Sequence, residues 1–264
     1  MTANSSQPSY VSVGMKAFAV CLSIVFMPAG LVAEVLIPER PGSYERSFEA
    51  DDFRLRFGLE VPEGATSGPR PLVLALHYGF DSSRPFPRYY GKQFAERVIS
   101  PGLRDLSAFI VSPDSHGHHW VDDEIAGPVL SLLDALATDP RVDGERIVVA
   151  GYSLGGTGTW FFAGEHTERF AAAVPMAGRM RPEWVERTNG LPVHALYSGD
   201  DELVSSKQIR DVLRRLRVPT VEFTELQGVS HYQSPLYAQA LRAIIVPWLR
   251  VQLAGSPEPA DSQD

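Results

Sequence analysis

The sequence predicts an α/β protein with a mostly parallel central sheet, helices on both faces of the sheet, and an N-terminal antiparallel hairpin at its edge. Short apolar runs alternate with helical segments along the chain, an order typical of parallel sheets covered on both faces. Residues 44–50 and 53–61 alternate apolar and polar side chains around Asp51 and Asp52, which indicates the hairpin. The 264 residues, 44% of them hydrophobic, suit one domain with a substantial core.

The individual elements follow from where the apolar residues fall. Beyond the hairpin, strands are expected at residues 72–76, 109–111, 147–150, 171–174, 193–197 and 220–226. Helices are expected at residues 89–99, 122–137, 157–164, 183–187, 205–217 and 237–253. The connecting residues 64–71 and 139–146 are expected to be turns.

One stretch joins an apolar strand to a helix through the pattern Gly-x-Ser-x-Gly, at Gly151, Ser153 and Gly155. So tight a turn forces the serine into a strained backbone conformation, and glycine at the flanking positions has no Cβ to clash there. The serine hydroxyl then stands at a helix N-terminus, where the helix dipole and the N–H of Leu154 can face a developing negative charge. The stretch therefore predicts a nucleophile elbow rather than a turn that contains a serine by chance.

A histidine and a carboxylate must complete such a site, because a serine hydroxyl is a weak nucleophile until a base takes its proton. Of the seven histidines, only His231 follows the last expected strand and precedes the final helix. Asp201 also follows a strand, so Ser153, Asp201 and His231 all lie beyond carboxyl ends of strands, where such sheets bind ligands. The neighbouring Asp200 is the other candidate acid, although we expect it to bond the turn backbone or cap the next helix.

With these residues in place, the chain resembles the α/β-hydrolase superfamily, in which the triad has the order Ser, Asp, His. More narrowly, it is similar to small secreted esterases related to polyhydroxybutyrate depolymerases, feruloyl esterases and the phospholipase/carboxylesterase group. The matching motifs are residues 76–80 (LHYGF), 142–147 (VDGERI), the elbow, 170–175 (FAAAVP), Asp201-x-x-Val204 and Gly228-x-x-His231. This resemblance covers nearly all of the chain after its leader and implies a carboxylic-ester hydrolase.

The chain departs from these relatives in the loop that supplies the oxyanion hole. Relatives usually have glycine directly after the histidine of this motif, whereas here Tyr78 separates His77 from Gly79. An oxyanion hole needs two donors, and the N–H of Leu154 is expected to be one of them. The second donor is the N–H of Gly79, the N–H of Tyr78 or the hydroxyl of Tyr78, and the sequence leaves all three open.

A histidine-rich loop is expected over the same sheet edge, with His116, His118, His119 and Trp120. We expect Trp120, His118, His119 and Phe80 to line the substrate pocket, with the indole as an apolar platform. A polar loop with no role in the site is the alternative. Histidines are also good zinc ligands, but no carboxylate is spaced to complete a metal site and a serine triad needs none. We therefore expect neither a metal nor a cofactor.

The charge balance bears on the class of partner. The chain has 24 Lys and Arg against 32 Asp and Glu, a formal net charge of −8, and no basic run. Nucleic acid is therefore excluded as an expected partner. The basic helix expected at residues 205–217 is interpreted as a solvated face.

Residues 1–33 are interpreted as a secretory signal peptide. A basic residue, Lys16, precedes an apolar run at residues 17–27, and Ala33 provides a small residue at the cleavage site. The run is too short to span a bilayer, so no stable membrane anchor is expected. The protein is therefore expected to be exported to the periplasm or the medium.

Cleavage after residue 33 would remove Cys21, the only cysteine, and leave no disulfide. Residues 34–253 would form the hydrolase domain and residues 254–264 a polar, disordered tail. Translation can begin at Met1 or at Met15, which provides the more usual start for a signal peptide.

Together these features predict an exported serine hydrolase that cleaves a small carboxylic ester through an acyl-enzyme intermediate. A peptidase of the prolyl-oligopeptidase type is one alternative, but it would carry a large extra domain for which we expect no room. A non-catalytic binding protein on the same fold is the other, and such proteins commonly lose a triad member. The sequence predicts neither the acyl or alcohol specificity nor the oligomeric state.

Overall fold

The computed structural model describes residues 1, 37–50, 53–80 and 83–254. The chain divides into two units, Met1–Glu34 and Val35–Asp264, and the fold described below belongs to the second. The expected signal peptide, apart from Met1, lies outside the described residues. So does the expected disordered tail, apart from Ala254.

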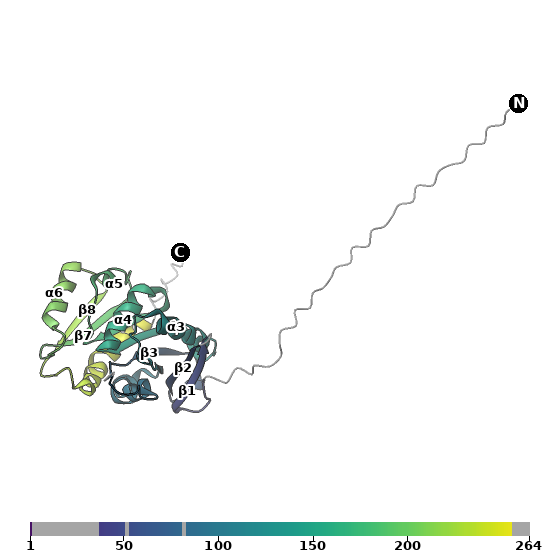
Figure 1. The fold of residues 1–264 in the computed structure, drawn as a ribbon, viewed down its shortest axis with the longest axis horizontal. Helices are drawn as coiled ribbons and strands as arrows, with labels where there is room; N and C mark the ends of the chain where they lie inside the picture. Colours follow the sequence, from purple (N-terminus) through teal and green to yellow (C-terminus); the bar gives the residue numbers. More distant parts are fainter. Residues whose placement is uncertain (2–36, 51–52, 81–82, 255–264) are drawn as a thin grey trace, which may run out of the picture. The chain divides into compact units, whose positions relative to one another are not determined.

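Within the described residues, eight strands form one sheet in the order β1-β2-β4-β3-β5-β6-β7-β8 (Figure 1). The strands are β1 (Gly42–Ala50), β2 (Phe53–Val61), β3 (Arg70–Leu76), β4 (Phe109–Pro113), β5 (Val142–Tyr152), β6 (Ala172–Met176), β7 (Val193–Ser198) and β8 (Val221–Leu226). β2 pairs antiparallel with β1 and with β4, and all other neighbouring strands pair parallel. The predicted mostly parallel sheet with an antiparallel hairpin at its edge is confirmed.

The helices are α1 (Tyr90–Phe94), α2 (Ser100–Leu103), α3 (Asp123–Ala137), α4 (Leu154–Glu165), α5 (Pro182–Glu186), α6 (Ser206–Leu216), α7 (Tyr237–Ala240) and α8 (Val246–Leu253). Helices α1 to α6 lie between strands in the chain, and α7 and α8 follow the last strand. Short 3₁₀ turns lie at Ala65–Ser67, Arg104–Leu106, Thr167–Arg169 and Ser234–Leu236. No helix in the described part of the chain is both long and apolar enough to cross a bilayer.

The helices predicted at residues 89–99 and 237–253 each contain a π-helical turn, and the first continues beyond its predicted end to Leu103. Ala95–Ile99 joins α1 to α2, and Leu241–Ile245 joins α7 to α8. Each π turn ends two residues before a proline, Pro101 or Pro247. Proline has no N–H to continue the regular hydrogen-bond ladder, which accounts for the wider turn at that point.

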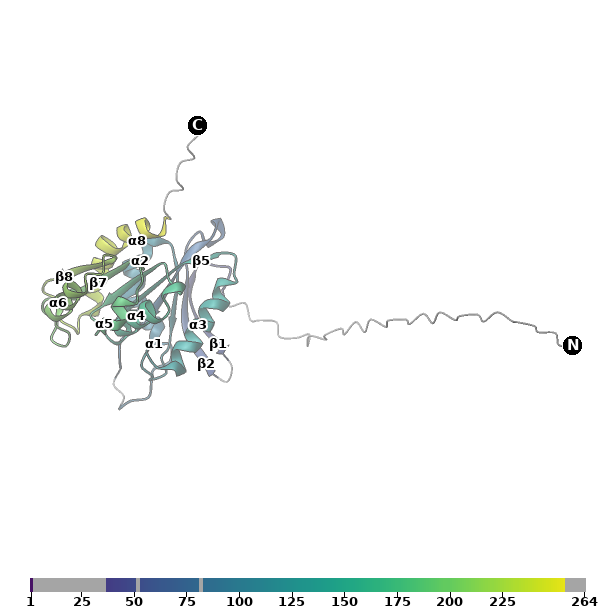
Figure 2. The ribbon, with the colours of Figure 1, turned by 90° about the horizontal axis from the view of Figure 1, so that it is seen from above.

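The core has two halves, one on each face of the sheet. Along β3, Leu72, Leu74 and Leu76 belong to one cluster of buried residues, while Val73 and Ala75 belong to the other. The first cluster includes residues of α3, α4, α5 and α6, and the second includes residues of α1, α2, α7 and α8. Helices therefore cover both faces, and Figure 2 shows α8 and α2 on the side away from α3 and α4.

Two predicted boundaries around the elbow are wrong. Residues 139–146 were expected to be a turn, yet β5 already begins at Val142, which pairs with Arg70. The helix expected from residue 157 begins at Leu154, because tertiary contacts hold the first turn. Gly155 and Gly156 have low intrinsic helix propensity, so propensity alone does not predict the first turn of α4.

Candidate active site

Ser153 lies between β5 and α4 with φ 56° and ψ −113°, a conformation that costs a non-glycine residue on the order of 1–3 kcal/mol. The flanking glycines permit it. A Cβ on Gly151 would meet the main chain of Gly155, and a Cβ on Gly155 would meet the main chain of Leu76. The N–H of Ser153 donates to the carbonyl of Met176 at 2.9 Å. The strand, strained turn and helix predicted from the Gly-x-Ser-x-Gly pattern are therefore present.

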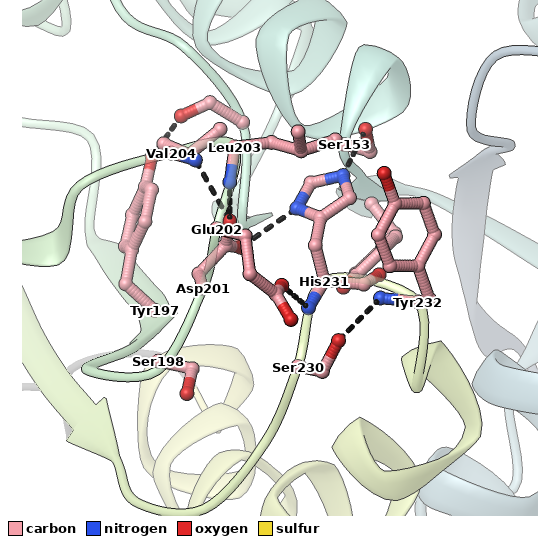
Figure 3. Close-up of polar contacts among 12 residues, drawn as sticks. Ser153, Tyr197, Ser198, Asp201, Glu202, Leu203, Val204, Ser230, His231 and Tyr232 are labelled. Carbon is pink, nitrogen blue, oxygen red and sulfur yellow. Dashed lines mark hydrogen bonds and ion pairs between the residues drawn. The ribbon is translucent and has the colours of Figure 1, made fainter.

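The structure brings Ser153, His231 and Asp201 together in one chain of hydrogen bonds (Figure 3). The Ser153 Oγ lies 2.8 Å from the His231 Nε2, and the His231 Nδ1 lies 2.7 Å from the Asp201 Oδ2. The side chains of His231 and Asp201 are 7% and 0% exposed. A carboxylate at Nδ1 fixes the proton on that nitrogen, which leaves Nε2 to accept the proton of the serine hydroxyl.

Asp201, and not Asp200, is the acid that contacts His231. The other Asp201 oxygen, Oδ1, accepts hydrogen bonds from the N–H groups of Leu203 at 2.8 Å and Val204 at 2.7 Å, so the loop holds the carboxylate rigidly. Asp200 instead accepts the N–H of Gly228 at 2.6 Å. It therefore ties the loop after β7 to the loop that leads to His231.

Capping of α6 falls to a different residue. The Ser205 hydroxyl accepts the N–H of Gln208 at 3.3 Å, as expected of an N-cap serine. Of the two roles expected for Asp200, the bond to a turn backbone is therefore the one that the structure contains.

Two side chains that the sequence argument missed hold the main chain of His231. The Oε2 of Glu202 accepts the His231 N–H at 2.9 Å, and the Tyr152 hydroxyl donates to the His231 carbonyl at 2.7 Å. Hydrogen bonds from the Ser230 side chain and the His231 N–H lower the pKa of Glu202. Burial, with the charges of Asp201 and Glu202, raises the pKa of Tyr152, so its phenol stays a donor. In the sequence, the only indication of these roles is that Glu202 lies next to Asp201 and Tyr152 lies next to Ser153.

The predicted oxyanion donors lie beside Ser153. Leu154 is the first residue of α4, where a main-chain N–H has no acceptor within the helix. Tyr78 and Gly79 line the same cavity as Ser153, and a Cβ on Gly79 would lie 3.9 Å from the Leu154 side chain. The Tyr90 hydroxyl donates to the Gly79 carbonyl at 3.2 Å, which fixes one peptide of this loop.

His77 serves this loop as a buried neutral ring. Its Nδ1 lies 2.6 Å from the carbonyl of Tyr78, and its Nε2 accepts the N–H of Ser115 at 3.1 Å. Burial lowers the pKa of His77 to about 4. The residue is fully buried, so its position suits holding the loop and not proton transfer to a substrate.

The prediction that Trp120 forms a platform in the pocket is wrong. Its side chain is fully buried, and its Nε1 donates to the carbonyl of His77 at 2.9 Å. A Cβ on Gly158 would meet the Cβ of Trp120, so the indole packs directly against α4. Because its N–H donates to a buried carbonyl and its ring lies in the core, Trp120 supports the loop that begins at His77.

The other three predicted pocket residues, His118, His119 and Phe80, are not among the residues that line the cavity at Ser153. The cavity at Ser153 has a volume of about 360 Å³ and is lined by Tyr78, Gly79, Tyr152, Ser153, Leu203, His231, Tyr232 and Ser234. His119 is exposed, the His118 ring lies 6.5 Å from the Phe53 ring, and the Phe80 ring packs 4.6 Å from the Phe86 ring. The lining therefore includes residues that follow Asp201 and His231, and it includes none of the histidine-rich loop.

No group of three or more His, Cys, Asp and Glu side chains within the described residues is arranged to hold a metal ion. A larger cavity of about 550 Å³ lies at the start of β4, and Glu60 and Glu96 are among its acidic lining residues. It contains neither Ser153 nor His231. The nucleophile and base candidates meet in the smaller cavity described above.

Comparison of the sequence with known proteins finds several similar proteins. Residues 115–231 match the Dienelactone hydrolase family. NocK, a candidate esterase of Nocardia uniformis subsp. tsuyamanensis, is 28% identical over 155 residues, which are 56% of this chain and 45% of NocK. The chain thus spans less than half the length of that relative.

Solved structures share the fold at lower identity. Est1E from Butyrivibrio proteoclasticus is 15% identical, with a TM-score of 0.63 over 80% of this chain and 99% of Est1E. The acylaminoacyl peptidase of Pyrococcus horikoshii is also 15% identical, with a TM-score of 0.63 over 84% of this chain and 43% of the peptidase. The sequence matches are therefore to proteins of the dienelactone hydrolase and esterase type. Its sheet order, its elbow and the matched solved structures show that the chain has the α/β-hydrolase fold.

Proposed function

We propose that this protein is a serine hydrolase that cleaves carboxylic esters through a covalent acyl-enzyme. The observation that carries the proposal is the pair of short contacts at His231, 2.8 Å to the Ser153 Oγ and 2.7 Å to the Asp201 Oδ2. This is the arrangement by which a histidine activates a serine while a carboxylate holds the histidine tautomer. The match to NocK adds support for ester chemistry.

In the first half of the reaction, the Ser153 Oγ bonds to the ester carbonyl carbon while its proton passes to the His231 Nε2. The carbonyl oxygen becomes an oxyanion, which the N–H of Leu154 and a donor from Tyr78 or Gly79 stabilise. When the intermediate collapses, the bond to the alkoxy oxygen breaks and the leaving alcohol takes the proton from Nε2. Asp201 remains ionised and stabilises the imidazolium that forms in between.

In the second half, water attacks the carbonyl carbon of the acyl-serine and gives a proton to the His231 Nε2. The bond to the Ser153 Oγ then breaks, the serine recovers its proton, and the carboxylic acid leaves. Each half uses the same oxyanion donors, so one arrangement serves both transition states.

Covalent labelling tests this proposal directly. Diisopropyl fluorophosphate should label the protein at Ser153, found by mass spectrometry of the digested protein, because only an activated serine reacts. Asp201→Asn should be labelled far more slowly than the wild type. Labelling at another residue, or none, would contradict the assignment.

Peptide-bond cleavage is a second candidate, because the matched solved structures include an acylaminoacyl peptidase of the same fold. An ester and an anilide with the same acyl group separate the two functions. Ester hydrolysis predicts turnover of p-nitrophenyl acetate with little turnover of p-nitroacetanilide or aminoacyl p-nitroanilides. Faster turnover of the aminoacyl anilides would favour the peptidase.

We also propose export, on the signal-like sequence of residues 1–33. The mature protein should then begin at Glu34. N-terminal sequencing of protein from the periplasm or the medium tests this. A cytoplasmic protein that keeps Met1 or Met15 as its first residue would contradict the signal peptide without affecting the proposed chemistry.

A further inference from the structure

The described residues leave few large apolar side chains exposed to solvent: Met1, Leu203, Tyr232, Leu236 and Val251. Leu203 is 51% exposed and Tyr232 is 76% exposed, and both line the cavity that contains Ser153. When a ligand removes an exposed apolar side chain from water, the free energy of the complex falls. Two of them at one cavity therefore indicate a surface that an apolar group covers.

Both residues are placed by the triad itself. Leu203 lies two residues after Asp201, and its N–H donates to the Asp201 Oδ1 at 2.8 Å. Tyr232 directly follows His231, and the two rings lie 6.1 Å apart in an edge-on arrangement. Figure 3 shows both side chains beside the His231 ring. A group held between them therefore lies next to the atoms that react.

Among the described residues, those that line the cavity offer no countercharge to an anionic group. They include no Lys, Arg, Asp or Glu side chain. The Glu202 carboxylate, bonded to the His231 N–H, and the Asp201 carboxylate, next to the His231 Nδ1, would repel an anion. A carboxylate that enters this cavity gives up its hydration without gaining an oppositely charged partner, whereas an uncharged apolar group has no such cost.

We propose that Leu203 and Tyr232 form a subsite for an uncharged, apolar alkyl or aryl group of the ester substrate. This inference rests on the proposed ester hydrolysis and narrows its substrate class. The subsite selects by contact with the leucine side chain and the tyrosine ring, and it discriminates against substrates that carry a carboxylate at the same position.

Two matched comparisons test the substrate class. p-Nitrophenyl butyrate and p-nitrophenyl hemisuccinate present acyl chains that end in a methyl or a carboxylate group. The kcat/KM of the butyrate should exceed that of the hemisuccinate by about tenfold or more, at high and low salt. Benzyl acetate and ethyl acetate compare a large with a small apolar group on the alcohol side, and p-nitrophenyl acetate provides the short acyl reference. A hemisuccinate that reacts as fast as the butyrate would overturn the proposal.

Variants then assign the selectivity to the two residues. Leu203→Ser with Tyr232→Ser should lower the butyrate-to-acetate ratio or the benzyl-to-ethyl ratio by about tenfold, the factor that burial of two methylene groups provides. Val251→Ser removes an exposed apolar residue of α8 and should leave both ratios unchanged. Ratios that stay at the wild-type value in the double variant would overturn the subsite.

Labelling separates failure of the subsite from failure of the proposed function. Each variant is treated with diisopropyl fluorophosphate, and its melting temperature is compared with that of the wild type. If Ser153 is labelled and esters turn over while the ratios do not change, only the subsite is wrong. If the wild type is neither labelled nor active on any ester, the proposed function is wrong, and the subsite falls with it.

Discussion

The Oε2 of Glu202 accepts a hydrogen bond from the main-chain N–H of His231 at 2.9 Å. The hydroxyl of Tyr152 donates to the carbonyl of the same residue at 2.7 Å. The loop after β7 and the end of β5 thus fix both polar groups of the His231 backbone. The imidazole bonds to Ser153 and Asp201 are made by a residue whose main chain is already held in place.

Replacing Glu202 should slow the chemical step. Glu202→Ala removes the acceptor of the His231 N–H, and we expect kcat to fall by about three- to tenfold with little change in KM. Glu202→Gln keeps an oxygen acceptor and should recover most of the lost rate. Steady-state kinetics on p-nitrophenyl acetate measure both variants.

The exposed Glu63 provides a control for loss of one negative charge. Glu63→Ala should not change kcat. If Glu202→Ala changes KM alone, Glu202 acts on substrate binding and does not position His231.

Tyr152→Phe should affect both stability and rate. The change leaves the His231 carbonyl without its partner, and we expect a loss of about 1–3 kcal/mol in the free energy of unfolding together with a several-fold lower kcat. Tyr44 also donates to a main-chain carbonyl, that of Arg40 at 2.8 Å, but from the edge hairpin. Tyr44→Phe should therefore leave kcat unchanged, and equal effects of the two changes on kcat would contradict the positioning role.

Substitutions of the two adjacent aspartates should affect different properties of the protein. Asp201→Asn keeps the shape of the loop but favours the wrong tautomer of His231, so kcat should fall by as much as ~10⁴-fold. Asp200→Asn weakens the bond to the Gly228 N–H and should cost about 1 kcal/mol in the free energy of unfolding, with a small effect on kcat. Turnover and melting temperature of both variants decide between them. A large loss of turnover in Asp200→Asn alone would reverse the assignment of the acid.

Acid should destabilise the protein through His77. Burial lowers the pKa of His77 from 6.5 to about 4 in the folded protein. Between those values the unfolded chain binds a proton that the folded protein does not. The free energy of unfolding therefore falls as the pH falls from about 6.5 to 4, and it keeps its full value above about pH 6.5. The loss is on the order of 3 kcal/mol at the acid end.

His77→Gln keeps a donor and an acceptor but does not titrate, so its stability should depend less steeply on pH between 6.5 and 4. His116, whose pKa burial also lowers to about 4, leaves part of the slope in place. The exposed His119→Gln is the control and should retain the wild-type slope. Denaturant unfolding at several pH values gives each slope, and identical slopes for all three proteins would contradict this source of acid sensitivity.

The fold could be predicted because the buried strands stand out in the sequence as short apolar runs. The apolar run that ends at Leu76 and the run that ends at Ala150 are buried on both faces of the sheet, and only a covered parallel sheet allows that. The elbow was equally readable, because Gly151 and Gly155 are required where main chains approach closely. Boundaries next to the elbow were not readable, since tertiary contacts override the propensities of Gly155 and Gly156.

The pocket could not be read in the same way. Trp120 and Tyr232 are both aromatic residues in loops at the same sheet edge, yet one is fully buried and the other is 76% exposed. What separates them is a carbonyl of His77 within reach of the indole N–H, a contact that no local pattern encodes. The roles of Glu202 and Tyr152 depend in the same way on main-chain groups distant in the sequence.

The most direct test of the whole account is the ester hydrolysis of Ser153→Ala. The account predicts that the purified wild-type protein hydrolyses p-nitrophenyl acetate, and that Ser153→Ala loses on the order of a million-fold in kcat while it keeps the melting temperature within a few degrees. Alanine keeps a Cβ, so the strain at φ 56° stays in place and gives no reason for a large change in stability. If the folded variant keeps more than a few per cent of the wild-type turnover, Ser153 is not the nucleophile and the account is wrong.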